Sequence, residues 1–280
     1  MSRRFSIPII TVVLYLGLAS TALQAGSILY GNNSSDGTPY IFAIDPNSGM
    51  ILQTYTNLSG DNGRGVAVVG NIIYYTTATS NKVYEETVGG VNMGVAFSVP
   101  GATALSAMAY DGTNFYIQAY DGTPDVYKVS PTGQLLGILQ LLHCGAGNCD
   151  GLEYFSMNGQ DYLVSNEHDG CCGGDNIYDL YDLNGTFIKV LLTAPNGTGI
   201  AFDGKDFFVS DILDGQVDKY DINGKFVGSI SLTGNGSYPL DVEDLSFDYS
   251  QTQTPEPGTL ALVGTGFLGI LGVARRKFQL

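Results

Sequence analysis

The sequence lacks tryptophan and is poor in charged residues, in basic residues and in histidine. Only 14% of its 280 residues are charged, which disfavours a fold of long charged helices. Twelve lysines and arginines stand against 27 aspartates and glutamates, a balance that excludes a binding surface for nucleic acid. No Gly-x-Ser-x-Gly elbow, P-loop or credible Ser-His-Asp set occurs. These absences favour a protein that is not an enzyme.

Glycine and aromatic residues are abundant instead. The chain has 38 glycines, 18 tyrosines and 13 phenylalanines. Aromatic and β-branched side chains favour pleated strands, and glycine with asparagine and aspartate favours tight turns. The composition therefore predicts an all-β fold.

The first 25 residues have the pattern of a signal peptide. Arg3 and Arg4 precede an apolar run at residues 7–18, and small residues then lead to Ala25. We expect cleavage after Ala25, because a short apolar run followed by small residues is typical of an exported precursor. A retained N-terminal membrane helix is the alternative.

The other end also suggests a membrane segment. A polar linker, residues 250–257, ends in Pro255-Glu256-Pro257, and the tail, residues 258–280, is apolar up to Ala274. Its 17 residues at 258–274 would form a helix about 25 Å long, just enough to cross a bacterial inner membrane. The cations that follow would remain in the cytoplasm, so the body would face outward. These cations are Arg275, Arg276 and Lys277.

Pro-Glu-Pro, one apolar span and a terminal basic cluster together resemble the PEP-CTERM sorting signal of Gram-negative bacteria that make exopolysaccharide. The resemblance covers the last 27 residues. It implies processing by an exosortase-type enzyme near Pro255-Glu256-Pro257 after initial anchoring in the inner membrane. The implied destination is the cell envelope, the cell surface or the extracellular matrix. A plain C-terminal membrane anchor is the alternative.

The body between these ends is strongly acidic. Residues 26–254 contain 7 basic and 26 acidic residues, a net charge of −19. Such a surface repels nucleic acid and anionic lipid. It suits bound cations, neutral glycans or simple solubility.

A repeat of about 45 residues sets the predicted architecture. Its clearest copy has four strand-like segments, at residues 199–202, 206–211, 216–221 and 225–230, separated by glycine-containing turns and loops. The glycines of the first turn in successive copies are 42, 47 and 45 residues apart. Four strands at this period are typical of a propeller blade. The glycines are Gly70, Gly112, Gly159 and Gly204.

The ends of the body complete the count. After the signal peptide the chain starts at residues 27–30 with a second-strand pattern and continues with strands at 40–45 and 50–55. The missing first strand appears at residues 244–248, 45 residues after its counterpart at 199–203. The sequence therefore predicts a five-bladed β-propeller over residues 26–249, whose first blade is closed by a C-terminal strand.

The amino-acid sequences of the strands also resemble those of NHL-type and lactonase-like propellers. Segments such as Val209-Ser210-Asp211 and Gly224-Lys225-Phe226 carry this resemblance. It covers the body at the level of fold and is too generic to imply an activity.

All four cysteines fall in the fourth repeat. An even number of cysteines in an exported chain favours disulfides. The two loops that hold them share one face of a propeller, so we expect one or two bridges between the loops, with a bridge between the adjacent pair as the alternative. Two neighbouring histidines make a zinc site the competing interpretation. The residues are Cys144, Cys149, Cys171 and Cys172, with His143 and His168.

Acidic residues are expected to gather around the mouth of the central channel. Asp150 and Glu243 belong to this group, but Glu153, Asp211 and Asp244 are the predicted ligands of Ca²⁺ or another divalent cation, because hard cations prefer oxygen ligands. In lactonase-like propellers such an ion polarises a substrate carbonyl, which makes a metal-dependent hydrolase or lyase the alternative function. The first hypothesis is a non-enzymatic module that binds a protein or a polysaccharide.

Overall fold

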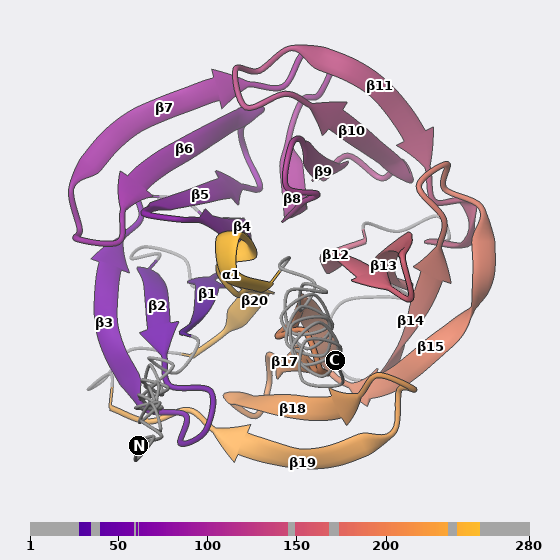
Figure 1. The fold of residues 1–280 in the computed structure, drawn as a ribbon. Helices are drawn as coiled ribbons and strands as arrows, with labels where there is room; N and C mark the ends of the chain where they lie inside the picture. The colour runs from indigo at the N-terminus through magenta and orange to yellow at the C-terminus, as the bar shows by residue number, and fades with distance from the viewer. Residues whose placement is uncertain are drawn as a thin grey trace, which may run out of the picture.

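The computed structural model describes residues 28–34, 40–58, 60, 62–144, 149–167, 174–234 and 240–252. Within them the chain forms five four-stranded antiparallel sheets around a central axis (Figure 1). The predicted five-bladed β-propeller is confirmed. The expected signal peptide, most of the expected linker and the expected membrane tail lie outside the described residues. Within the described ranges no helix is long and apolar enough to cross a membrane.

Each blade runs from an inner strand at the axis to an outer strand at the rim (Figure 1). The first blade consists of β20 (Val242–Ser246), β1 (Leu29–Asn33), β2 (Tyr40–Ile44) and β3 (Ile51–Thr56). The second consists of β4 (Gly63–Val69), β5 (Ile72–Thr77), β6 (Lys82–Thr87) and β7 (Asn92–Ser98). The third consists of β8 (Leu105–Tyr110), β9 (Phe115–Ala119), β10 (Asp125–Val129) and β11 (Leu135–Gln140).

The remaining two blades follow the same order. The fourth consists of β12 (Leu152–Met157), β13 (Gln160–Glu167), β14 (Asp175–Tyr181) and β15 (Phe187–Pro195). The fifth consists of β16 (Gly197–Phe202), β17 (Asp206–Asp211), β18 (Gln216–Asp221) and β19 (Phe226–Ser231). Two short helices complete the described chain, η1 (Leu142–Cys144) before the fourth blade and α1 (Tyr249–Thr252) after β20.

The ring closes by pairing the two ends of the body. β20 pairs antiparallel with β1, and Tyr30 lies opposite Ser246 while Gly31 lies opposite Leu245. The predicted closure of the first blade by a C-terminal strand is therefore confirmed. β1 starts two residues and ends three residues later than predicted, and β20 is displaced by two residues toward the N-terminus.

Glycine at one equivalent position of three inner strands lets these strands approach closely. A Cβ atom at Gly65 would lie 2.5 Å from the carbonyl oxygen of Ser106 in the next blade. One at Gly199 would lie 2.7 Å from the carbonyl oxygen of Glu243, and Gly151 is equally confined by the fifth blade. Only glycine allows a backbone to pass another at this distance. The axis of the propeller is consequently narrow.

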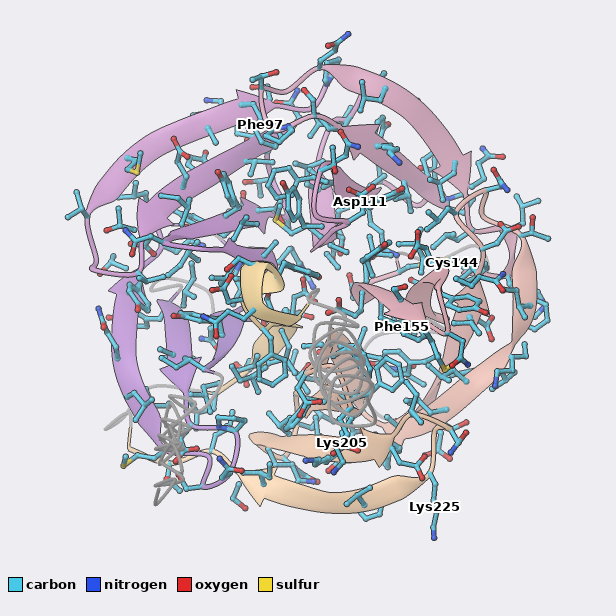
Figure 2. The ribbon with its side chains drawn as sticks, in the orientation of Figure 1. Phe97, Asp111, Cys144, Phe155, Lys205 and Lys225 are labelled. Atoms are coloured by element: carbon cyan, nitrogen blue, oxygen red, sulfur yellow. A yellow bond between two sulfur atoms is a disulfide. The ribbon has the colours of Figure 1, made fainter. Side chains whose placement is uncertain are left out.

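Aromatic side chains fill the spaces between blades. Phe155, labelled in Figure 2, packs its ring 5.2 Å from that of Phe202 in the next blade. Aromatic pairs of this geometry add favourable edge and stacking interactions to the burial of apolar area. Three more blade interfaces are bridged in the same way, by Tyr74 with Phe115, Tyr116 with Tyr154, and Phe208 with Phe247.

Many aspartates have local roles in turns. The carboxylate of Asp221 accepts hydrogen bonds from the backbone N–H groups of Asn223 and Lys225, at 2.9 and 3.0 Å. Asp182 does the same for Asn184. Aspartate favours turns because its side chain can cap the backbone two residues later. Lys225 itself points outward at the rim (Figure 2). Part of the acidic composition is thus explained by turn formation.

The short helix α1 occupies the end of the predicted propeller and the start of the predicted linker. Its first residue, Tyr249, is buried, and its ring lies edge-on at 6.2 Å from that of Tyr110. In Figure 1 α1 lies beside β4 and β20, near the axis. The end of the described chain therefore covers the inner strands.

Candidate functional site

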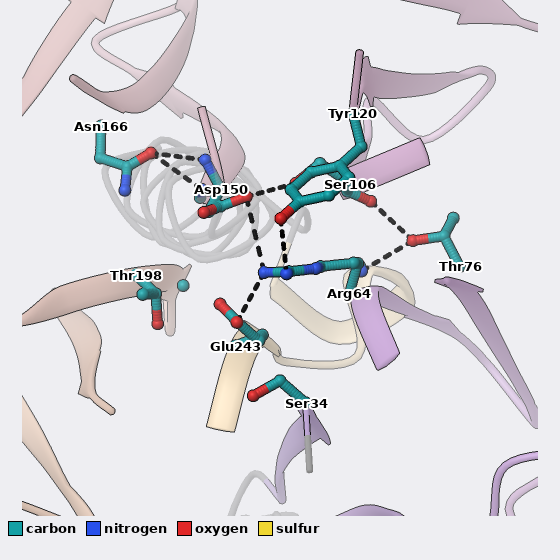
Figure 3. A network of polar contacts seen from close by, with 12 residues as sticks. Ser34, Arg64, Thr76, Ser106, Tyr120, Asp150, Asn166, Thr198 and Glu243 are labelled. Carbon is teal, nitrogen blue, oxygen red and sulfur yellow. Dashed lines mark hydrogen bonds and ion pairs between the residues drawn. The ribbon is translucent and has the colours of Figure 1, made fainter. Parts of the chain in front are cut away.

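A cluster of polar side chains lies where the inner strands begin (Figure 3). Each blade supplies one residue from the start of its inner strand, and we call these five residues the axial polar cluster: Arg64, Ser106, Asp150, Thr198 and Glu243. All five are buried. The propeller fold thus brings together residues that are up to 179 positions apart in the sequence.

Arg64 is the centre of this cluster. Its Nη1 lies 2.6 Å from Oε1 of Glu243 and 3.8 Å from Oδ1 of Asp150. Its Nη2 donates a hydrogen bond of 2.8 Å to the hydroxyl of Tyr120, and its guanidinium carbon lies 4.3 Å from the centroid of that ring. A planar guanidinium suits such a site because it can bond carboxylates and stack on an aromatic ring at once.

Both carboxylates of the cluster interact with neighbouring polar or charged groups. Burial raises the pKa of Glu243, while the positive charge of Arg64 opposes the shift and the negative charge of Asp150 adds to it. Asp150 also accepts a hydrogen bond of 2.9 Å from the hydroxyl of Ser106. One buried cation therefore serves two buried carboxylates, an arrangement that is costly to disturb.

The backbone at the cluster is fixed by side chains of second strands. Oδ1 of Asn166 accepts hydrogen bonds of 2.9 Å from the backbone N–H groups of Asp150 and Gly151. The hydroxyl of Thr198 shares a hydrogen bond of 2.9 Å with that of Ser210. The two bonds to Asn166 occupy backbone N–H groups at the inner edge of the fourth blade, which no further strand pairs. The cluster is therefore held rigidly.

Asp244 lies further along the inner strands. Its Oδ2 accepts hydrogen bonds from the backbone N–H groups of Val66 and Met108, at 3.0 and 3.3 Å. Burial raises the pKa of Asp244 well above its ordinary value, although these N–H groups and that of Leu245 favour the charged form. A single side chain thereby links the first three blades.

Glu153 is the second carboxylate beyond the axial polar cluster. Burial raises the pKa of Glu153 well above its ordinary value, although the nearby Tyr249 hydroxyl and the N–H groups of Phe202 and Tyr154 favour the charged form. The negative charge of Glu153 also contributes to the raised pKa of Asp244. The structure therefore brings these two predicted ligands into electrostatic contact.

Asp211, the third predicted ligand, has a different role. Its Oδ1 accepts hydrogen bonds from the backbone N–H of Asp214 and from Nδ2 of Asn196, at 3.1 and 3.2 Å. It thus caps the turn between β17 and β18. Across the part of the chain that the structure describes, no group of three or more His, Cys, Asp or Glu side chains is arranged to hold a metal ion.

Sequence reasoning found the acidic half of the site and missed the rest. It placed Asp150 and Glu243 at the starts of inner strands, where they are. It did not identify Arg64 or Tyr120. Arg64 is one of only seven basic residues in the body, and it directly precedes the glycine of an inner strand. The rarity of basic residues could have singled out Arg64 as a candidate. Its partners could not be identified in this way, because they come from other blades.

The cysteine pairing differs from the prediction. Cys144 and Cys149 form a disulfide within one loop, with Cα atoms 6.1 Å apart, rather than a bridge between two loops. Both residues are buried, and Cys144 ends η1 while Cys149 lies shortly before β12. His168, Cys171 and Cys172 lie outside the described residues, as do Pro255, Glu256, Pro257, Arg275, Arg276 and Lys277.

Comparison with known proteins identifies the tail and the fold. Residues 253–277 match the PEP-CTERM protein-sorting motif. The search of curated proteins gave no match. A chain in a crystal structure of a nidogen/laminin complex is similar with a TM-score of 0.54 and 12% identity, covering 81% of this chain and 100% of that one. A protein of unknown function from Bacteroides caccae has a TM-score of 0.50 and 12% identity, covering 80% and 100%. At this identity the likeness concerns the fold alone.

Proposed function

We propose that this protein is an exported β-propeller that acts at the cell envelope or surface of a Gram-negative bacterium as a binding module, for a partner protein or a polysaccharide. One observation carries the proposal: the PEP-CTERM motif at residues 253–277 begins directly after α1, shortly after β20, the strand that closes the propeller. A sorting motif in this position would deliver a complete, rigid body to the outside. The enzyme that reads the motif would be of the exosortase type.

The body has the properties of a binding module. The 20 strands of the described residues form a closed ring, and the axial polar cluster is internally paired through Arg64, Glu243 and Asp150. Function in such folds is supplied by the surface that the scaffold holds in place. The net charge of −19 over residues 26–254 disfavours nucleic acid and anionic lipid as partners.

Replacing Pro255-Glu256-Pro257 by three alanines tests the sorting part of the proposal. The full chain and this variant are expressed in the source bacterium, and cell fractions are compared by immunoblotting. We expect the variant to accumulate in the inner membrane while the native chain reaches the surface. Replacement of Ser250, Gln251 and Thr252 by alanine is the matched control, because it changes the same linker outside the motif. Equal distribution of all three proteins would contradict the proposal.

Cross-linking on intact cells tests the binding part. Cells that display the native chain are treated with a cross-linker, and the adducts are purified and analysed for protein and carbohydrate. We expect a saturable adduct whose yield falls when purified chain is added as competitor. Absence of any saturable adduct would indicate a structural spacer.

The alternative function is a divalent-metal-dependent, lactonase-like hydrolase or lyase that uses Glu153, Asp211 and Asp244. Its support is limited to Glu153 and Asp244, which interact electrostatically, because Asp211 is engaged in a turn. Metal analysis of the purified full chain, compared with Glu153→Gln and Asp244→Asn, distinguishes the two functions. A stoichiometric ion that both substitutions remove would favour the enzyme.

A further inference from the structure

A groove of about 1030 Å³ runs between the third and fourth blades, away from the axial polar cluster. It is lined by β10 and β11 on one side and by the turn between β14 and β15 on the other, with η1 at one end. Cys144, labelled in Figure 2, marks the boundary between these blades. The size is that of a ligand site rather than of a packing defect.

An aromatic platform lies in this groove. The rings of His143 and Phe187 stack with centroids 4.1 Å apart and an interplanar angle of 16°. About half of the His143 side chain is exposed, and Phe187 is 38% exposed. Two flat rings are therefore partly open to solvent at the same place.

Two interactions fix the position of the His143 ring in this platform. Nδ1 of His143 lies 2.8 Å from Oδ2 of Asp179, whose side chain is fully buried. The disulfide between Cys144 and Cys149 constrains the loop that carries His143. A buried carboxylate and a disulfide thus fix an exposed ring, which is the preorganisation that a binding site requires.

The fifth blade has a phenylalanine at the position equivalent to Phe187 but, within the described part of the chain, no histidine stacked on it. Phe226 begins β19 as Phe187 begins β15, and it lies opposite Tyr220 as Phe187 lies opposite Tyr181. Both phenylalanines meet their tyrosine edge-on. Only Phe187 has a histidine stacked on it among the ring contacts of the described residues. The platform is therefore an addition to the repeat.

The groove offers polar groups of both kinds, and the formal charges of Asp125 and Lys128 in its lining balance. Lys128 is paired with Asp111, at 3.3 Å between Nζ and Oδ2. Asp125 accepts a hydrogen bond of 2.9 Å from Nε2 of Gln140. Asn184 and Thr186 add an amide and a hydroxyl to the lining. On a body of net charge −19 this neutral, mixed lining favours an uncharged ligand with many donors and acceptors.

A strand of another protein, added to the edge of a sheet, fits this groove less well than an uncharged polar ligand does. The turn at Gly185 lies against the end of β11, where a Cβ atom would come within 2.6 Å of the carbonyl oxygen of Gln140. The groove therefore presents side chains and a turn at that end rather than a free strand edge, which strand addition requires.

We propose that the groove between the third and fourth blades binds a neutral saccharide, with the apolar C–H face of one sugar ring against the solvent-exposed part of the platform that the stacked rings of Phe187 and His143 form. The hydroxyl groups of the sugar would exchange hydrogen bonds with Gln140, Asn184 and Asp125. The inference rests on the proposed function, since it names the ligand class and the surface of that binding module.

Saturation-transfer NMR on the purified full chain tests the proposal. The chain is kept in a detergent without a sugar headgroup, and the probes are maltohexaose, cellohexaose and a hexasaccharide of galacturonic acid. We expect at least one neutral probe to receive saturation at its ring C–H protons. Its dissociation constant should rise at least tenfold in Phe187→Ala and change less than twofold in Phe226→Ala, the matched control.

Phe187→Leu provides a second variant in case the alanine variant does not fold, because it keeps apolar volume and removes the ring. We expect the same loss of binding. The proposal is overturned if neither neutral probe binds, if only the galacturonic acid probe binds, or if Phe187→Leu binds as the native chain does. Any of these results would leave the sorting and cross-linking outcomes unaffected, so the proposed function is tested separately.

Discussion

Arg64 and Glu243 lie 2.6 Å apart, from Nη1 to Oε1, and thereby join β4 of the second blade to β20 of the first. Because β20 closes the ring, this ion pair connects the start of the second blade to the end of the body. Asp150 shares the same cation from the fourth blade. The pair therefore stabilises the closure of the propeller.

Arg64→Met should destabilise the protein strongly. The substitution keeps most of the side-chain volume and leaves two buried carboxylates without their cation, which costs about 3–5 kcal/mol. The free energy of unfolding is measured by urea denaturation of the full chain. Lys205→Met is the control, since Lys205 is exposed and its partner Asp206 keeps a second cation, Lys219, and it should change stability by less than about 1 kcal/mol. Equal effects of the two substitutions would refute the role given to Arg64.

Gly199→Ala should also be severe, for a steric reason. The added Cβ would overlap the backbone of Asp244 and lie 2.7 Å from the carbonyl oxygen of Glu243, so two inner strands would have to separate. We expect a loss of about 3 kcal/mol, at the upper end for an overpacked core. Gly228→Ala is the matched control in an outer strand, where the new methyl group meets open space. For Gly228→Ala we expect no loss in the free energy of unfolding. Urea denaturation curves that shift equally for both variants would contradict the close approach of the two inner strands at the axis.

The propeller could be predicted because its signal is local and repeated. Turn residues such as Asp203-Gly204 and strands of alternating pattern recur at a regular spacing, and each copy forms the same four strands. The segment Asn92–Ser98, which forms β7, fits the repeated pattern less clearly, because it has two exposed residues at its start and a glycine with positive φ.

The candidate sites could be predicted only in part, because they depend on contacts between blades. Asp150 and Glu243 could be placed at inner strands by counting repeats. Their pairing with Arg64 depends on how the blades are arranged in space. The same holds for Phe187 and His143, which belong to different elements and form a stack only when η1 meets the turn before β15. A short-range pairing, Cys144 with Cys149, was missed because the prediction favoured two loops.

The disulfide predicts a specific peptide map. Digestion of the purified chain without reduction should give a peptide holding both Cys144 and Cys149 that is lighter by two hydrogens than its reduced form. Replacing both residues by serine should lower the free energy of unfolding by about 2 kcal/mol, a small value for a disulfide because the closed loop is short. Peptides that link either residue to Cys171 or Cys172 in the native chain would contradict the bridge.

Glu86 predicts a dependence of stability on pH. Its side chain lies in β6, almost fully buried, and its Oε1 has no hydrogen-bond partner among the described residues. Burial raises the pKa of Glu86 from an ordinary value of 4.5 to about 7, and the titratable groups that it faces are Tyr55 and Tyr75. Because the folded state holds the proton more tightly, the stability that this group contributes is complete below pH 4.5 and is lost as the pH rises through 7.

Glu86→Gln isolates this effect because glutamine is neutral at every pH. Below pH 4.5 the variant and the native chain should unfold at similar urea concentrations, whereas at pH 8 the variant should be more stable by about 3 kcal/mol. Glu85→Gln is the control, since Glu85 is the neighbouring residue of β6, points to the opposite face of the sheet and is less buried. Its curve should run parallel to that of the native chain. The same gain for Glu86→Gln at pH 4 and pH 8 would mean that the pKa of Glu86 is the same in the folded and unfolded states, because only a difference in proton binding between the two states makes stability depend on pH.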